Sequence, residues 1–295
     1  MKIDLHIHST CSDGRMPLEE IFKTARRKDI GCISIADHDS IDCQEAAKAL
    51  ARQYDMQYIF GLELNVSFSH PGYRKGKPVS LDFLGYQYDI HDQALAKKLQ
   101  DLRAYRRKRA DQILKNINHE LVKADLEAFT PEDLDEIQDS VDGTLGRPHL
   151  ADSLVERGIV SDKQEAFDRY LVKCNVPKMP LTLSEASDLV RGAGGKLILA
   201  HPNHPRGTSL ISFTSSLDEQ QKIIEETMLP YIDGIECWHS SHDEKTTTSY
   251  LVFSKRFGLM VTGGSDCHQH PVLMGTLDVP GYVAEQFDLP DAVSP

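Results

Sequence analysis

Long apolar runs are missing from this sequence. No stretch approaches the roughly 18 consecutive apolar residues that a membrane-spanning helix needs. No charged-then-apolar leader is present either, because the opening MKIDLHIH is already part of a folded segment. Internal repeats and low-complexity segments are absent as well. We therefore expect a cytoplasmic protein that has no membrane partner.

Paired cysteine motifs and an excess of positive charge are also missing. The six cysteines form no C-x-x-C pair and no spacing typical of a secreted domain, so we expect free thiols. The formal net charge of −12 argues against broad electrostatic binding to duplex DNA. An anionic substrate is not excluded, because bound metal cations reverse the field locally.

Short β-type runs alternate with helix-type segments along most of the 295 residues. The runs span residues 3–7, 32–37, 58–68, 79–88, 196–202, 232–238 and 259–264. This alternation is typical of parallel β/α organisation and predicts an α/β fold, most simply a closed, TIM-like barrel of seven strands.

One long region breaks the alternation. Residues 91–180 have helical patterns throughout and begin with one long helix, whose apolar positions recur from Leu95 to Leu121. We interpret this region as an inserted helical subdomain that caps the barrel. The predicted division is therefore a barrel made of residues 1–90 and 181–295, with the insertion at 91–180.

Histidines and carboxylates gather near the C-terminal ends of the predicted strands. The residues concerned are His6, His8, Asp13, His38, Glu63, His201, Asp266 and His268. In a β/α barrel these strand ends converge on one mouth, so residues two hundred positions apart in sequence meet there. A single H-x-H pair or a single acid is more often structural, but the whole set in this order predicts a metal site.

The spacing of the histidines supports this interpretation. Residues two apart in an extended strand point to the same side, so His6 and His8 are placed to bind one cluster together. Asp266 and His268 have the same relation if their segment is extended. Imidazole and carboxylate together suit zinc, manganese or iron.

The motifs HIHSTCSDG, ADHDS, GLELN, LAHP and GGSDCH resemble, in this order, those of the polymerase-and-histidinol-phosphatase (PHP) superfamily. The resemblance covers residues 1–90 and about 180–275. It implies a distorted seven-stranded β/α barrel and a two- or three-metal centre that hydrolyses phosphate esters. The insertion looks like the branch that contains nucleotide phosphatases and 5′-end-directed oligonucleotide exonucleases. In that branch the residues that match Arg147 and His149 lie over the mouth of the active site.

One position departs from the family pattern. Where the family usually has a histidine ligand, in V-H-x-L-G-Y, this chain has Asp82 in VSLDFLGY. A carboxylate is a harder ligand that adds negative charge, so it shifts the metal preference toward manganese or iron. A phosphodiesterase that acts on a cyclic sugar phosphate, and a histidinol-phosphatase-like activity, therefore stay open.

We expect a metal-dependent hydrolase of phosphate esters with two or three divalent ions, manganese, iron or zinc. A hydroxide that bridges two metals would attack phosphorus in line. The expected substrates are 5′-AMP, a nucleoside 3′,5′-bisphosphate, a sugar phosphate or the 5′ end of a short oligonucleotide. The expected metal ligands are His6, His8, Asp13, His38, Glu63, Asp82, His201, Asp266 and His268, of which Asp13 and His268 are also expected to take part in catalysis.

Other residues are candidates for contacts around the metals. Arg147 is the strongest, because its guanidinium fork suits phosphate oxygens. The remaining substrate-binding candidates are His149, His242 and Arg106. Asp37 and Asp39 flank His38 and are expected to orient its imidazole.

Three other functions fit parts of the pattern. A metal-dependent amidohydrolase also begins with H-x-H, but those with paired metals commonly use a modified lysine where this chain has Asp82. A binding module with a relic site conflicts with the nearly complete motif set. A non-catalytic nucleic-acid-binding protein is disfavoured by the net charge and by the lack of an aromatic platform.

Overall fold

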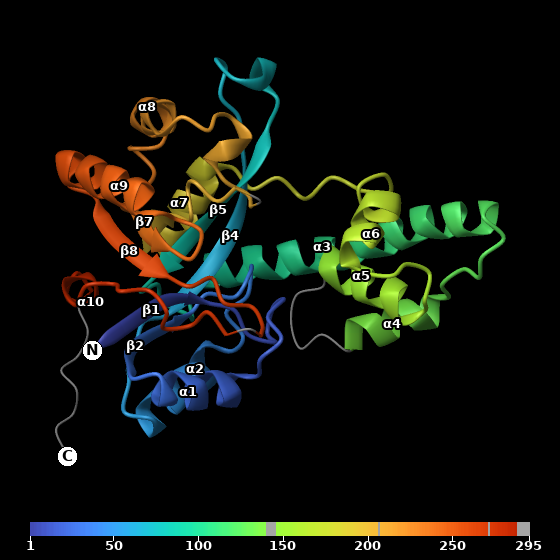
Figure 1. Ribbon diagram of the computed structural model, residues 1–295, viewed down its shortest axis with the longest axis horizontal. Helices are drawn as coiled ribbons and strands as arrows, with labels where there is room; N and C mark the ends of the chain where they lie inside the picture. Colours follow the sequence, from blue (N-terminus) through green and yellow to red (C-terminus); the bar gives the residue numbers. More distant parts are fainter. Residues whose placement is uncertain (140–145, 206, 271, 288–295) are drawn as a thin grey trace.

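Eight strands in two sheets form the centre of the molecule (Figure 1). The computed structural model describes residues 1–139, 146–205, 207–270 and 272–287, and the strand count refers to these residues. The first sheet has the order β1-β2-β3 and the second has the order β4-β5-β6-β7-β8. The strands are β1 Lys2–Ile7, β2 Ile30–Ile35, β3 Gln57–Tyr58, β4 Gly61–Phe68, β5 Val79–Tyr86, β6 Lys196–Leu199, β7 Gly234–His239 and β8 Met260–Gly264.

The α/β class is confirmed, but the predicted seven-stranded barrel of parallel strands is not. The third predicted run is divided at Ile59–Phe60, so that β3 belongs to the first sheet and β4 to the second. Strand β5 runs antiparallel to both β4 and β6. Residues 69–78 connect β4 to β5 with only a short 3₁₀ turn, η1 (Arg74–Gly76), and such a direct connection pairs successive strands antiparallel.

The two sheets meet at two seams. At one seam Ile7, at the end of β1, forms a parallel bridge with Cys267, just beyond β8. At the other, His38, just beyond β2, forms a parallel bridge with Glu63 in β4. Each seam therefore runs through or beside residues that the sequence predicted to bind metal.

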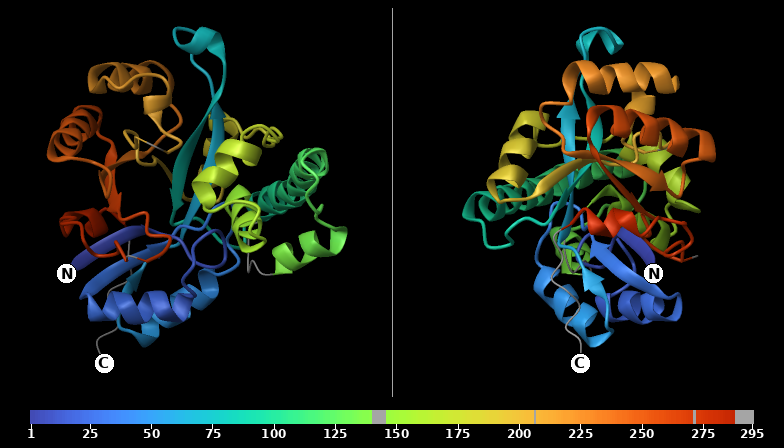
Figure 2. Two further views of the ribbon diagram at one scale, coloured as in Figure 1. Left: turned by 45° about the vertical axis from the view of Figure 1, so that its right-hand side comes forward. Right: turned by 90° about the vertical axis from the view of Figure 1, so that its left-hand side faces the viewer.

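Helices cover both sheets (Figure 2). Helices α1 and α2 pack on the first sheet in a core that contains Phe22, Ile33 and Ala47. Helices α7, α8 and α9 contribute to the core around the second sheet, with Val190, Ile224 and Phe253. These helices are α1 Leu18–Arg27, α2 Gln44–Gln53, α7 Leu183–Gly192, α8 Leu217–Thr227 and α9 Glu244–Phe257, and the short η3 Leu210–Ser212 and α10 Tyr282–Glu285 complete this part.

Helix α3 (Gln93–Lys123) connects two separate hydrophobic cores. Its first half places Leu95, Leu99 and Leu102 in the core of the second sheet. Its second half contributes to a core that runs from Ala110 to Cys174 and belongs to the helical region. Figure 1 shows α3 leading away from β4 to this region. The other elements there are α4 Pro131–Asp139, α5 Arg147–Glu156, α6 Lys163–Ala166 and η2 Phe167–Leu171.

The helical region was predicted from its periodicity, and helices are present there. The proposed division into a barrel and a capping subdomain at residues 91–180 stays a prediction. None of the helices in the described part of the chain has the length and apolarity that crossing a bilayer requires.

The expectation of free thiols is wrong for one pair of cysteines. Cys11 and Cys43 form a disulfide, with their Cα atoms 6.3 Å apart. The pair is 32 residues apart in sequence, so no local spacing signalled it, whereas the loops that follow β1 and β2 converge in space. Cys32, Cys174, Cys237 and Cys267 are free and buried.

Candidate metal centre

Four side-chain atoms converge at the junction of the two sheets, and we call their residues the inner group: His6, His8, Glu63 and Asp266. The Nε2 atoms of His6 and His8 lie 3.1 Å apart. Glu63 Oε2 lies 3.5 Å from His6 Nε2 and 3.2 Å from His8 Nε2. Asp266 Oδ1 lies 3.4 and 3.3 Å from the same two nitrogens. The side chains of His6, His8 and Glu63 are at most 1% exposed.

This arrangement fits a metal ion. Two carboxylate oxygens and two imidazole nitrogens with lone pairs face one point, which is unfavourable unless a proton or a cation lies between them. Ligand atoms about 2.0–2.1 Å from a tetrahedral ion lie about 3.3–3.4 Å from one another. Five of the six distances within the inner group are 3.1–3.5 Å, which agrees with that spacing.

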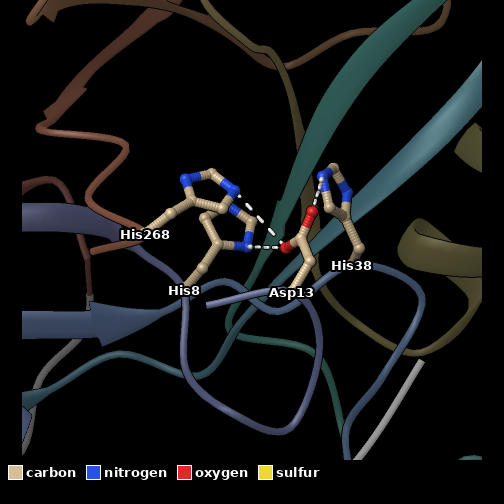
Figure 3. Close-up of side chains that lie close together, drawn as sticks. All are labelled: His8, Asp13, His38 and His268. Carbon is tan, nitrogen blue, oxygen red and sulfur yellow. Dashed lines mark ion pairs between the residues drawn. The ribbon is translucent and has the colours of Figure 1, made fainter. Parts of the chain in front are cut away.

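A second convergence, the outer group, consists of His8, Asp13, His38 and His268 (Figure 3). Asp13 lies at its centre, with Oδ1 3.4 Å from His268 Nε2 and 3.7 Å from His8 Nδ1. Its Oδ2 lies 3.8 Å from His38 Nε2. This group is more open to solvent than the inner group, since Asp13, His38 and His268 are 21–31% exposed, whereas Asp266 is 18% exposed and the rest of the inner group is buried.

Glu63 connects these groups to a third set of candidate ligands. Its Oε2 lies 3.1 Å from His38 Nδ1, and its Oε1 lies 3.1 Å from His201 Nε2. Asp82 is farther away, with Oδ2 4.0 Å from His201 Nε2. Asn65 donates to Asp82 Oδ1 at 2.5 Å. Burial raises the pKa of Asp82, and the neighbouring Glu63 carboxylate raises it further.

The carboxylates control the protonation of the histidines. Burial alone would lower the pKa of His8, but its contacts with Asp266 and Glu63 outweigh burial and raise the pKa to about 10. The pKa of His201 is likewise raised to about 9, because Glu63 outweighs burial. Burial acts to raise the pKa of Asp266, yet His6 and His268 hold it well below the usual range. Such a cluster favours positive charge at its centre.

Two residues of β7 that were not predicted from the sequence support the inner group. Glu236 is fully buried; its Oε1 lies 3.0 Å from His6 Nδ1, and its Oε2 accepts the backbone N–H of His201 at 2.8 Å. His239 Nδ1 accepts the N–H of Ser241, which places the ring proton on Nε2, 3.5 Å from Asp266 Oδ2. The available signal was a carboxylate inside an apolar strand run, IECW, the same feature that identified Glu63.

The backbone at the site adopts unusual conformations. His201 and Asp266 have φ values of 25° and 54°, in the left-handed region that side chains other than glycine rarely adopt. Gly264, at the end of β8, approaches β1 so closely that a Cβ atom would lie 2.3 Å from the backbone N of His6. A larger residue there would push β8 away from the metal centre.

Beside the outer group a cavity of about 210 Å³ extends toward the helical region. Asp13 and His38 form one side of it, and Arg147 at the start of α5 forms the other. Arg106, which the sequence placed facing inward, also borders the cavity and pairs with Asp39. The remaining cationic residues of the wall are Arg109 and Lys178.

The other predicted residues make mainly structural contacts. His149 borders a second cavity of about 360 Å³ that also reaches Asp13, and its Nδ1 accepts the N–H of Gly146 at the start of α5. His242 donates from Nδ1 to the carbonyl of Cys237, and its Nε2 accepts the N–H of Asn203. Burial lowers the pKa of His242 to about 4, so the ring is a poor source of a proton, and its expected role as a substrate contact stays a prediction.

The carboxylate of Asp37 organises the loop that carries Asp13. It accepts hydrogen bonds from the backbone N–H and the hydroxyl of Ser9, at 2.8 and 2.6 Å, and from the hydroxyl of Ser12 at 2.5 Å. Asp39 accepts from Arg106 and so links the loop after β2 to α3. Both aspartates therefore act on the loops of the outer group.

Comparison with known proteins gives consistent matches over most of the chain. The PHP domain matches residues 4–171. A 5′-3′ exoribonuclease from Haemophilus influenzae is 27% identical over 274 residues, 90% of each chain. A 3′,5′-nucleoside bisphosphate phosphatase from Chromobacterium violaceum is 27% identical over 279 residues, 90% of this chain and 87% of the other. A crystal structure assigned as a metal-dependent phosphoesterase, from Bifidobacterium adolescentis, is 25% identical with a TM-score of 0.78, covering 96% of this chain and 94% of its own.

Proposed function

Since the chain belongs to the PHP domain family and is a phosphoesterase, we propose that it hydrolyses a phosphate ester of a small nucleotide that carries a second phosphate. A nucleoside 3′,5′-bisphosphate and the 5′ end of a short oligonucleotide both meet this description. The names of the two relatives agree with it. The observation that carries the proposal is a wall of cations that faces the outer group across the 210 Å³ cavity.

Apart from Arg106, which pairs with Asp39, the cations of this wall lack carboxylate partners. Among the described residues, no carboxylate oxygen lies within 4.0 Å of the charged nitrogens of Arg109, Arg147 or Lys178. Arg109 is only 8% exposed and donates to the carbonyl of Val176 and to Asn175 Oδ1. Burial, and after it the nearby Arg147 and Arg106, lower the pKa of Arg109 to about 10. Arg109 is thus buried beside the half-buried Arg106 and Arg147, and an anionic ligand stabilises cations in such an arrangement.

The position of the wall follows from the way in which α3 joins two hydrophobic cores. The basic stretch RAYRRKR lies between the half of the helix in the sheet core and the half in the helical core. Arg107 and Lys108 point to solvent, as expected for most of this stretch, whereas Arg106 and Arg109 face the cavity. Arg147 comes from α5, where its guanidinium lies 5.4 Å from the centre of the Phe167 ring. The cavity is thus bounded by metal-site loops on one side and helical-region cations on the other.

We propose that the nine predicted residues hold two or three divalent ions. His6, His8, Glu63 and Asp266 would hold one ion, with His8 binding through Nε2. Asp13, His38 and His268 would hold another, with His201 and Asp82 completing the set. Bound ions would supply Lewis-acid activation of the ester and of water. Glu236 and His239 would fix the rings and carboxylates that face the ions, and Arg147 and Arg109 would bind and orient the second phosphate.

Phosphorus NMR tests this proposal. The manganese-loaded protein is incubated with 5′-AMP, adenosine 3′,5′-bisphosphate and ribose 1,2-cyclic phosphate, with a chelator-treated sample as control. We expect metal-dependent release of phosphate, fastest from the bisphosphate. Ring opening of the cyclic ester with both nucleotides untouched would assign the site to a cyclic sugar phosphate, the alternative that Asp82 raised. Equal rates for AMP and the bisphosphate would show that the cationic wall does not bind a second phosphate.

A further inference from the structure

The disulfide between Cys11 and Cys43 connects the two loops that carry Asp13 and His38 of the outer group. Cys11 lies in the loop after β1, two residues before Asp13. Cys43 precedes the first residue of α2, at the end of the loop that carries His38. The Cα atoms of Cys11 and Cys43 are 6.3 Å apart, which is within the usual range for disulfides. The positions that the two loops have in this structure are therefore compatible with the bond.

The cross-link acts on one metal group and not on the other. Three residues of the inner group belong to strands or directly continue one, since His6 lies in β1, His8 follows it and Glu63 lies in β4. Strand pairing therefore fixes them independently of the disulfide. Asp13 and His38 lie in loops, and their facing atoms, Oδ2 and Nε2, are 3.8 Å apart. The bond limits how far these two side chains separate.

A metal site made by the two cysteines themselves is the alternative. The sulfurs and a carboxylate oxygen of Asp37 lie within 4.8 Å of one another, a spacing that would suit an ion. However, the carboxylate of Asp37 already accepts three hydrogen bonds from Ser9 and Ser12. Sulfurs joined in a disulfide also offer no thiolate ligand. The geometry therefore favours a redox role for this pair over metal binding.

We propose that Cys11–Cys43 is a redox modification site, whose oxidised form holds the outer group ready for its metal ion and whose reduced form binds that ion more weakly. A dithiol reductant supplies the two electrons. One of its sulfurs attacks the disulfide and releases one cysteine, and its second sulfur then releases the other. The protein gains two electrons and two protons as two S–H groups, and the dithiol becomes a disulfide. This inference rests on the metal-binding part of the proposed function.

The state of the cysteines is measured first. Protein purified without reductant is unfolded, alkylated and weighed by mass spectrometry before and after dithiol treatment. We expect four modified cysteines before reduction and all six after it, in accordance with the single disulfide. Six modified cysteines in the untreated protein would overturn the proposal.

Metal content is measured next, after the dithiol has been removed by desalting. We expect the reduced protein to release its most weakly bound ion about tenfold more readily, a change of the size produced when support around metal ligands is lost. Cys11→Ser and Cys43→Ser should match the reduced protein and ignore the dithiol, while Cys174→Ser, in the helical core, should behave as the parent protein. Equal metal affinity in the oxidised and reduced proteins would refute the proposal. So would an additional ion in the reduced protein that is absent from Cys43→Ser, because it would show that the two thiols bind metal. These readouts do not use turnover, so the failure of the nucleotide assignment would be recognised separately.

Discussion

Glu236 Oε1 lies 3.0 Å from Nδ1 of His6, a residue 230 positions earlier in the chain. The contact joins β7 to β1 on the side of the His6 ring that faces away from the inner group, and neither side chain has measurable exposure. An imidazole that donates Nδ1–H to a carboxylate presents Nε2 as a lone-pair donor, which is the form that binds metal. The orientation of His6 therefore depends on a residue outside the proposed ligand set.

Replacing Glu236 with glutamine should weaken metal binding. The amide keeps the shape of the side chain but removes the charge that orients His6, so we expect a loss of about 10- to 100-fold in affinity for the tightest ion. Titration of the metal-free protein by calorimetry measures this loss. Glu225→Gln, an exposed substitution on α8, is the matched control. An unchanged affinity would show that Glu236 has no positioning role.

Removing a proposed ligand should abolish most of the turnover. His8 takes part in both the inner and the outer group, and Asp266 closes the inner group, so His8→Ala and Asp266→Ala should each lower kcat by about a hundredfold or more. His119→Ala, on an exposed position of α3, should leave both rate and metal content unchanged. Near-normal metal content in either active-site variant would refute the ligand assignment.

The parts of the site that follow from local geometry were predicted from the sequence. His6 and His8 share a strand face, so the alternation of the strand was enough to bring them together. The partners of Glu236 and His239 lie on β1 and beyond β8, so their contacts could not be derived from the sequence around β7. The carboxylate inside the apolar run IECW was the one local signal, and it was not used. The Cys11–Cys43 bond was missed because its two cysteines, too, are distant in sequence.

In the fold, too, the features that were not predicted depend on how distant segments pair. The β-type runs were located correctly, but their directions were not, because a run of apolar residues has no sign that distinguishes parallel from antiparallel pairing. Only the absence of a helix between β4 and β5 carried that information. The inward position of Arg106 was predicted because Arg106 continues the apolar register of α3. Arg109 lies seven residues after Leu102, two helical turns along the same face, but it was overlooked because it belongs to a basic stretch.

The cationic wall should distinguish between substrates. Arg109→Met keeps the length of the side chain and removes its charge, so KM for a nucleoside 3′,5′-bisphosphate should rise about tenfold or more, while KM for the monophosphate changes little. Lys108→Met, one residue earlier and exposed, is the control. Steady-state kinetics with both substrates gives the result, and equal effects on the two would place the second phosphate elsewhere.

The metal-free protein should lose stability in mildly alkaline solution. The pKa values of His8 and His201 in the folded protein are raised to about 10 and about 9, so the folded state binds more protons than the unfolded state above the usual histidine pKa of about 6.5. The stability that these protons provide is complete below pH 6.5 and is lost as the pH rises through 9 and 10. Thermal unfolding of chelated protein should therefore show Tm falling by several degrees between pH 6.5 and 9.5.

Metal-loaded protein provides the comparison for that experiment. Ligand histidines are neutral when they bind a metal, so the loaded protein should show a much smaller decline over the same interval. If the chelated and loaded proteins had parallel curves, the histidines would not be the source of the effect.

Introducing a histidine at position 82 should change the metal preference. Asp82 is 5% exposed, and its carboxylate lies beside His201 and Asn65. Asp82→His replaces a hard oxygen ligand with imidazole, so we expect the protein to retain zinc better relative to manganese. Competition between the two metals, followed by elemental analysis, measures the ratio, and an unchanged ratio would place Asp82 outside the metal site.

The seams between the two sheets also have a consequence for biosynthesis. Residues 2–58, with the whole first sheet, leave the ribosome before β4 begins, but the bridge from Ile7 to Cys267 needs a segment made more than two hundred residues later. The nascent chain therefore holds His6, His8, Asp13 and His38 without Asp266 and His268. An ion bound at that stage would have an incomplete set of the proposed ligands and would exchange freely. The choice of metal would then be made only after the last strand has joined the first.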